Sequence, residues 1–218
     1  MSATAPFLLT FAVMEEARPF QRRLKSDGNV HCAITGMGQK NAVRTVRPLL
    51  EERRFSSLLS CGFAGALDPS LAIGDVLFNA DADFSLRKEL LAAGAREVRF
   101  YCASRVAVTI AEKAELRRNT GADAVEMESQ GLRELAREFG IPSATVRVIS
   151  DTAMENLPID FNDVLKADGT MNWTRFAATL LRQPSSIAGL MRLQRQTALA
   201  AERLCEVLVS VLDPGARR

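Results

Sequence analysis

The chain has 218 residues, of which 47% are hydrophobic and 25% charged, a balance typical of a globular protein. Its net charge of +2 does not indicate a nucleic-acid partner, and no apolar run is long enough to span a membrane. Acidic residues follow the apolar N-terminal stretch directly, which argues against a signal peptide. We therefore expect a cytoplasmic protein that forms a single domain over residues 1–218.

The chain contains four widely separated cysteines and one histidine, without any spacing typical of a metal site. Three of the cysteines lie in apolar, strand-like runs, where a free thiol packs as a small hydrophobic group. We expect reduced cysteines, no metal and no cofactor.

Two kinds of hydrophobic pattern alternate along the first 150 residues or so. Short apolar runs with β-branched residues indicate buried strands, and apolar residues three and four apart indicate helices. The predicted strands are residues 7–12, 29–35, 57–61, 75–79, 98–103, 106–109 and 144–149, with 124–127 leading into a helix. The predicted helices are residues 16–25, 40–53, 87–93, 111–118 and 128–139. This alternation predicts a largely parallel sheet with helices on both faces.

The pattern changes after Leu157. Residues 173–181 and 186–212 are predicted helices and no strand follows, so residues 158–218 form a helical C-terminal extension. The second helix carries an apolar stripe made of Ile187, Leu190, Met191, Ala198, Leu204, Val207 and Val211. The stripe indicates packing against the sheet or another subunit, and peripheral contact with lipid is the alternative.

Two glycine-rich segments follow predicted strands, where ligands bind in open α/β sheets. Gly36-Met37-Gly38 and Gly62-Phe63-Ala64-Gly65 either offer backbone N–H groups to an anion or only turn the chain from strand to helix. Neither has the third glycine or the lysine that dinucleotide-binding or nucleotide phosphate-binding loops require.

Three carboxylates stand at the ends of apolar runs. Glu126 and Glu128, two residues apart, would share one face of a strand, and an unpaired carboxylate there would be costly. A surface strand end is the alternative. Asp151 ends a run interrupted by Arg147, so a helix N-cap or an ion pair with Arg147 is the alternative to a catalytic role.

The segments MEE, GFAGAL, AVEMES and VRVISD, in this order between Phe7 and Ala153, resemble the nucleoside phosphorylase and nucleosidase superfamily. The resemblance is strongest to methylthioadenosine/S-adenosylhomocysteine nucleosidases and to phosphorylase-like proteins associated with hopanoid biosynthesis. The C-terminal extension resembles only the second group. The resemblance implies a three-layer α/β/α fold with a mostly parallel mixed sheet, and a homodimer. It also implies hydrolysis of the N-glycosidic bond of an adenine nucleoside or 5′-substituted adenosine, such as adenosylhopane.

The resemblance also implies roles for single residues at the sugar and the water. Glu16 matches the acid that activates the attacking water, although a shift of one residue would put Glu15 there, and Arg147 matches a basic residue near the water. Glu128 matches the carboxylate that binds the ribose 2′ and 3′ hydroxyls. Carboxylates favour the oxocarbenium-like sugar of such a reaction.

Other residues are assigned by the same resemblance. Asp151 matches the acid that protonates the purine N7, and Ser150 orients it; a departing purine anion needs such a proton. Met127 packs against the sugar and Glu126 supports the site. The remaining substrate-binding candidates are Gly62, Phe63 and Ala64.

The chain also departs from its relatives. Ser60 stands where true phosphorylases carry a phosphate-binding arginine, and Phe63 where a small hydroxyl residue is common, so water is the expected nucleophile. A phosphate-dependent phosphorylase and a non-catalytic nucleoside-binding protein are the alternatives. The segment between Asp75 and Val125 is shorter than in methylthioadenosine nucleosidases and lacks their aspartate-and-phenylalanine wall around the base.

Overall fold

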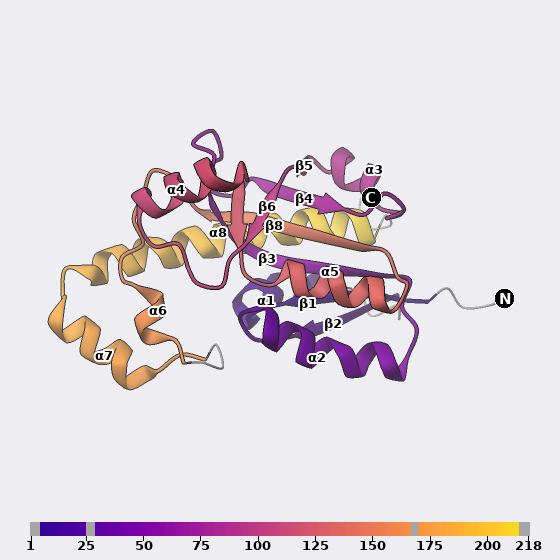
Figure 1. The fold of residues 1–218 in the computed structure, drawn as a ribbon, viewed down its shortest axis with the longest axis horizontal. Coiled ribbons are helices and arrows are strands. Elements are labelled where there is room, and N and C mark those ends of the chain that lie inside the picture. Colours follow the sequence, from indigo (N-terminus) through magenta and orange to yellow (C-terminus); the bar gives the residue numbers. More distant parts are fainter. Residues whose placement is uncertain (1–4, 25–28, 167–169, 214–218) are drawn as a thin grey trace.

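The computed structural model describes residues 5–24, 29–166 and 170–213 (Figure 1). Within these residues an eight-stranded sheet has the order β2-β1-β3-β8-β4-β5, with β7 pairing with β3 and β6. The strands are β1 (Phe7–Phe11), β2 (Val30–Ile34), β3 (Ser57–Ala66), β4 (Val76–Ala80), β5 (Arg96–Glu97), β6 (Phe100–Cys102), β7 (Ala124–Glu126) and β8 (Ser143–Asp151). Only the β3–β7 and β4–β8 pairs are antiparallel among these pairings. The sheet is therefore mixed and mostly parallel, as expected.

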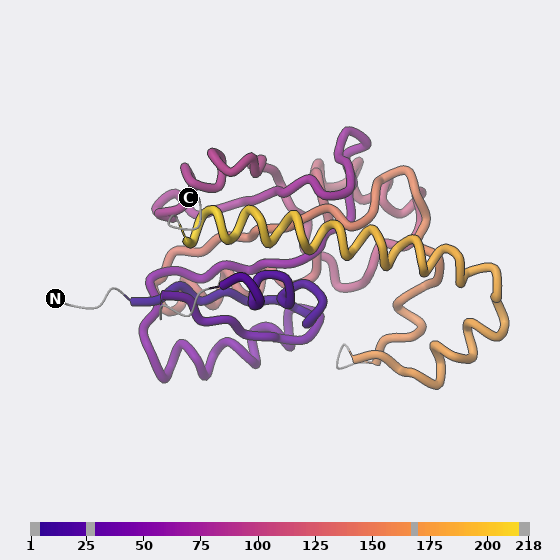
Figure 2. Tube along the Cα trace, turned by 180° about the vertical axis from the view of Figure 1, so that it is seen from behind, coloured from indigo at the N-terminus to yellow at the C-terminus, as the bar shows by residue number. Residues whose placement is uncertain are grey.

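Helices cover both faces of this sheet. The helices of the described residues are α1 (Met14–Arg23), α2 (Gln39–Glu52), α3 (Arg87–Ala92), α4 (Ile110–Thr120), α5 (Ser129–Glu138), α6 (Phe161–Val164), α7 (Trp173–Arg182) and α8 (Ser186–Leu212), of which α7 projects away from the sheet (Figure 1). Helices α1 and α8 pack together on one face, and α2 packs with α5 on the other (Figures 1 and 2).

Neighbouring residues of β1 contribute to the two largest hydrophobic clusters of the described residues. Leu9 packs in one core with Phe20 of α1 and Leu204 of α8. Leu8 packs in the other core with Val46 of α2. Successive side chains of a strand point to opposite faces, so one strand supplies both cores. The predicted three-layer α/β/α architecture is confirmed.

Strand β3 is longer than predicted. The expected turn at Gly62–Gly65 is wrong: the strand runs from Ser57 to Ala66 and pairs with β8 along most of its length, with a shift in register after Ala64. Strand β8 likewise continues to Asp151, beyond the predicted end at residue 149. Glycine inside a strand permits a close approach by other groups, and carboxylates occupy that space here.

Residues 106–109 do not form the predicted strand. The Asn162 side chain bonds both the backbone N–H and the carbonyl of Val106, at 2.9 and 3.0 Å, and Leu157 N–H donates to the Val108 carbonyl. These contacts attach the segment to α6 and the residues before it instead of to the sheet. The predicted strand at 98–103 is confirmed as the shorter β6, and the two-residue β5 that precedes it was not predicted.

Helix α1 begins two residues earlier than predicted, at Met14. Pro19 lies inside this helix, beyond its first turn, where its missing N–H leaves one carbonyl of the helix without its usual donor. The predicted end of this helix at Lys25 lies outside the described residues.

The two predicted C-terminal helices are confirmed as α7 and α8, but the predicted stripe on α8 is only half right. Leu204, Val207 and Val211 are buried, because this half of α8 lies along the sheet (Figure 2). Ile187, Met191 and Ala198 are exposed. In the part of the chain that the structure describes, no helix is both long and apolar enough to cross a bilayer.

Candidate active site

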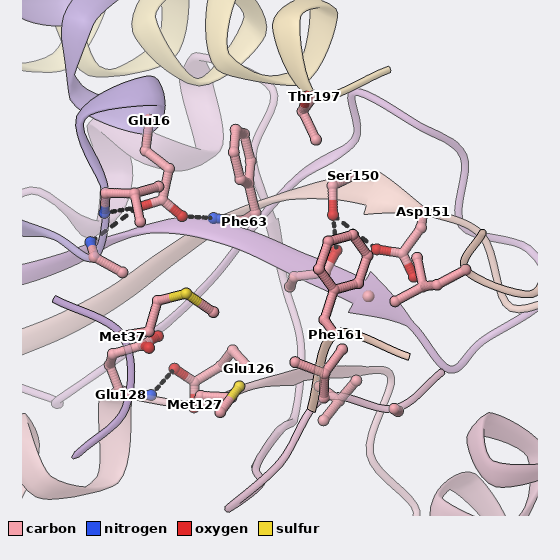
Figure 3. Close-up of a pocket in the computed structure, with 18 of the residues that line it drawn as sticks. Glu16, Met37, Phe63, Glu126, Met127, Glu128, Ser150, Asp151, Phe161 and Thr197 are labelled. Carbon is pink, nitrogen blue, oxygen red and sulfur yellow. Dashed lines mark hydrogen bonds between the residues drawn. The ribbon is translucent and has the colours of Figure 1, made fainter. Parts of the chain in front are cut away.

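A cavity of about 250 Å³ opens at the carboxyl ends of β1, β3 and β8 (Figure 3). Eight of the residues singled out in the sequence line it: Glu16, Phe63, Ala64, Glu126, Met127, Glu128, Ser150 and Asp151. Figure 3 shows Glu16, Glu128 and Asp151 approaching the cavity from three sides. The sheet thus gathers side chains that are more than a hundred residues apart in the chain.

Glu16 lies in the first turn of α1, with only 5% of its surface exposed. Its Oε2 accepts hydrogen bonds from the N–H groups of Ala12 (2.8 Å) and Val13 (3.1 Å), and its Oε1 accepts one from Phe63 N–H (2.8 Å). Burial raises the pKa of Glu16 above its ordinary value, although these bonds and a nearby guanidinium oppose the shift. Its neighbour Glu15 is exposed, so Glu16 is the residue that reaches the cavity.

Glu128 occupies the N-cap position of α5, immediately after β7. Two positions were open for Glu128: the helix predicted to begin there is confirmed, and a strand face shared with Glu126 is wrong, because β7 ends at Glu126. Its Oε1 accepts a hydrogen bond from Gly38 N–H at 2.7 Å. Burial raises the pKa of Glu128 to about 7. A carboxyl group that titrates near neutrality therefore faces the cavity.

Two backbone N–H groups of the glycine-rich segments already have acceptors. Phe63 N–H is bound to Glu16, and Gly38 N–H is bound to Glu128. These segments were candidates for binding an external anion. The anion at each of these two donors is instead a carboxylate of the protein itself.

Arg147 lies beneath the cavity, and its side chain is only 1% exposed. It donates to Glu126 Oε2 at 2.7 Å and to the carbonyl and Oγ of Ser60 at 2.5 and 2.9 Å, and its Nη2 lies 3.6 Å from Glu128 Oε2. Burial alone would raise the pKa of Glu126, but Arg147 and hydrogen bonds from Ser129 hold it below its ordinary value. Glu126 is thus a charged partner of Arg147, and neither Arg147 nor Gly62 lines the cavity.

Asp151 is held on both of its carboxylate oxygens. Ser150 Oγ donates to Oδ1 at 2.8 Å, as the expected orienting contact requires, and Lys113 Nζ donates to Oδ2 at 2.6 Å. The alternatives of an N-cap and of an ion pair with Arg147 are wrong, because Asp151 is the last residue of β8 and its ion-pair partner is Lys113.

Sequence reasoning missed Lys113. Its side chain is fully buried, and Nζ also donates to the carbonyls of Thr152 (2.7 Å) and Glu155 (3.1 Å). In the sequence it stands among charged residues of a helix, like an ordinary surface lysine. No local pattern distinguishes it.

An apolar wall completes the cavity on the side of the C-terminal helices. It was also missed, because its residues come from irregular segments, from the start of the short helix α6 and from one turn of α8. Its members are Val106, Ala107, Leu157, Phe161 and Leu193, with Thr197 and Arg105 beside them.

Within residues 5–24, 29–166 and 170–213, no group of three or more histidine, cysteine, aspartate or glutamate side chains is placed to hold a metal ion. The four cysteines are free thiols.

Known proteins share both the sequence pattern and the fold. The profile of the phosphorylase superfamily matches residues 9–82 and 77–182. A 5′-methylthioadenosine/S-adenosylhomocysteine nucleosidase from Helicobacter pylori, solved with butyl-thio-DADMe-Immucillin-A, superposes with a TM-score of 0.70 at 16% identity, over 98% of this chain and 100% of that one. The nucleosidase from S. pneumoniae with the transition-state inhibitor MT-ImmA gives 0.70 at 14% identity, over 95% and 98%. Futalosine hydrolase of Helicobacter pylori gives 0.64 at 18% identity, over 96% and 100%. At these identities the likeness concerns the fold.

Proposed function

The chain belongs to the phosphorylase superfamily, and on that basis we propose that it hydrolyses the N-glycosidic bond of a purine nucleoside. Three of the four carboxylates that line the cavity, Glu16, Glu128 and Asp151, support this reaction, since it needs a base, a partner for the sugar and an acid. The solved structures that share this fold are named as nucleosidases and as a futalosine hydrolase, and these names support a hydrolase that acts on a nucleoside.

In the proposed reaction, different residues act on the purine base and on the ribose. Asp151, oriented by Ser150, gives a proton to N7 of the purine, so that the base leaves as a neutral molecule. Glu128 accepts hydrogen bonds from the ribose 2′ and 3′ hydroxyls and stabilises the positive charge that develops on the sugar. Met127, Phe63 and Ala64 line the cavity around the sugar.

At the other face of the sugar, Glu16 takes a proton from the attacking water. Its raised pKa, which is due to burial, suits a general base that works near neutral pH. Arg147 lies beneath the cavity, and its positive charge offsets part of the repulsion between Glu16 and Glu128 because it lowers the pKa of both carboxyl groups. Gly62 leaves room for the carboxylate of Glu16.

One observation favours water over phosphate as the nucleophile. The N–H groups of Gly38 and Phe63 are occupied by Glu128 and Glu16, so a phosphate would meet carboxylates where it needs donors. The cation beneath the cavity is bound to Glu126 and Ser60. Phosphorolysis remains the alternative enzyme reaction.

We further propose a 5′-substituted adenosine with an apolar 5′ group as the substrate. The apolar wall formed by Val106, Leu157, Phe161 and Leu193 supports this choice. The resemblance to hopanoid-associated proteins, for which an adenosylhopane is the implied substrate, points the same way. Burial of such a group contributes roughly 25 cal/mol per Å² of apolar area.

The deciding experiment incubates the protein with a panel of adenosine derivatives, with and without phosphate, and measures free base and sugar products by chromatography. In phosphate-free buffer we expect adenine and the free ribose derivative as products, formed at the same rate as in buffer with phosphate. Turnover that requires phosphate and yields a ribose 1-phosphate would establish the phosphorylase instead. Saturable binding of a nucleoside without release of base would identify a non-catalytic binding protein.

A further inference from the structure

We propose that Lys113 is the proton source behind Asp151, so that the two side chains act as one acid. This inference rests on the proposed nucleosidase function. It concerns a residue that does not line the cavity and acts only through Asp151, as a positioning residue that also stores the proton.

The hydrogen bonds of the pair define its resting state. Each of the three N–H groups of the Lys113 ammonium has its own acceptor: Asp151 Oδ2 at 2.6 Å, Thr152 O at 2.7 Å and Glu155 O at 3.1 Å. Asp151 accepts from Lys113 on Oδ2 and from Ser150 on Oδ1. All these contacts fit an ammonium beside an ionised carboxylate. An ionised carboxylate has no proton to give, so the proton for the purine must come from elsewhere.

The nearest proton is the one between Lys113 Nζ and Asp151 Oδ2. As the bond between the purine and the ribose breaks, its electron pair goes to the base. Lys113 Nζ gives a proton to Asp151 Oδ2, and Asp151 delivers that same proton to N7. The pair then consists of a neutral amine and a carboxylate, and the base is neutral. The proton lost by the attacking water is held by Glu16. After the products leave, Glu16 releases that proton to solvent and Lys113 regains one through Asp151.

The surroundings of Lys113 suit this exchange. The side chain has no exposed surface, so its ammonium exchanges protons with the cavity through Asp151. The amine still has two N–H groups for the carbonyls of Thr152 and Glu155. Lys113 therefore keeps its position throughout, and the carboxylate of Asp151, 10% exposed, is the link to the cavity.

The test compares two variants on two substrates. Lys113→Met removes the ammonium and keeps most of the apolar stem. Lys113→Arg keeps the charge and the donors but retains its proton, because a guanidinium is not deprotonated in proteins. One substrate is the adenosine derivative that the parent cleaves best. The other is 4-nitrophenyl β-ribofuranoside, whose leaving group departs as a stable anion without an acid.

Both variants are expected to lose on the order of 10²-fold in kcat on the adenosine derivative, and to cleave the nitrophenyl riboside within a few-fold of the parent. Equal losses on both substrates would make Lys113 a structural residue only. Parent-like turnover of the adenosine derivative by Lys113→Met, or full rescue by Lys113→Arg, would also overturn the proposal.

A measurement on the unchanged protein covers the case in which the variants do not fold, as judged by circular dichroism. In mixtures of H₂O and D₂O, the rate on the adenosine derivative is expected to depend on the deuterium fraction along a curve, because the proton from Lys113 and the proton that Glu16 takes from water both move as the glycosidic bond breaks. A straight line overturns the relay. If the parent releases no base from any derivative, it is the proposed function that fails.

Discussion

The carboxylate of Glu16 lies so close to the α-carbon of Gly62 that a Cβ there would come within 2.6 Å of Oε1. The two residues belong to α1 and to the middle of β3, and the same carboxylate oxygen accepts the N–H of Phe63. Gly62, the first glycine of GFAGAL, therefore leaves room for the Glu16 carboxylate and lies within a strand instead of a turn.

Gly62→Ala should lower activity by on the order of tenfold to a hundredfold, because the added methyl group displaces the Glu16 carboxylate from the attacking water. The φ of Gly62, 154°, adds backbone strain. Steady-state rates and thermal unfolding are the measurements. The control is Gly140→Ala, at the end of α5, which shares a positive φ but would place its methyl group in open space. Equal loss of activity in the two variants would refute the explanation.

Asp151→Asn should reduce kcat by on the order of 10²–10⁴-fold, since an amide cannot deliver the proton. It should also destabilise the protein by about 3–5 kcal/mol, because it leaves the Lys113 ammonium buried without its carboxylate. The double variant Asp151→Asn with Lys113→Met should recover stability and stay inactive. Denaturant unfolding of the parent, the two single variants and the double variant gives the coupling energy between Asp151 and Lys113. A double variant no more stable than Asp151→Asn would contradict a stabilising ion pair between these two residues.

The kcat/KM of the parent should rise with pH through about 7. Burial raises the pKa of Glu128 to about 7 and also raises that of Glu16, and both groups act as carboxylates in the proposed reaction. A rate profile from pH 5 to 9 on one substrate checks this. Activity that is flat across that range would show that neither carboxyl titrates in the free enzyme.

Glu128→Gln should be inactive but more stable than the parent above pH 7, by on the order of 1–3 kcal/mol. In the folded protein this carboxyl holds its proton up to about pH 7, but in the unfolded chain only up to about 4.5. The folded state thus binds more protons between these values, and its free energy of unfolding falls as pH rises through this window. An amide does not titrate, so the Glu128→Gln variant does not show this decrease in the free energy of unfolding. Unfolding at pH 5 and pH 8 is the measurement.

The control for this variant is Glu134→Gln, an exposed glutamate on the same helix. It should leave the pH dependence of stability as it is in the parent. A gain in stability at pH 8 that is the same for both variants would mean that burial of Glu128 has no part in the effect.

The apolar wall should set the preference for the 5′ group. We expect a higher kcat/KM for adenosine with a long apolar 5′ chain than for methylthioadenosine. Leu193→Asn should lower kcat/KM for the long-chain substrate on the order of tenfold. Leu199 is exposed on the same helix outside the cavity, so Leu199→Asn should change kcat/KM for neither substrate. A strong preference of the parent for methylthioadenosine would reject the apolar 5′ group while leaving nucleoside hydrolysis intact.

The sequence by itself determined the layers of this protein, because hydrophobic periodicity is a local property. Alternating apolar runs such as residues 144–149 indicated buried strands, and spacing such as that of Ala42 and Val46 indicated helices that cover them. The order of MEE, GFAGAL, AVEMES and VRVISD indicated the superfamily and the carboxylates that line the cavity.

The tertiary structure alone decided which groups meet inside that cavity. Gly38 and Glu128 are 90 positions apart, Phe63 and Glu16 are 47 apart, and Lys113 and Asp151 are 38 apart. Such pairs depend on strand order and register, in which β3 lies between β1 and β8 and runs on past its glycines. The contacts of each buried carboxyl group then decided its pKa. Glu128 and Glu126 are both buried, but the pKa is raised at Glu128 and lowered at Glu126, because Arg147 donates a hydrogen bond only to Glu126.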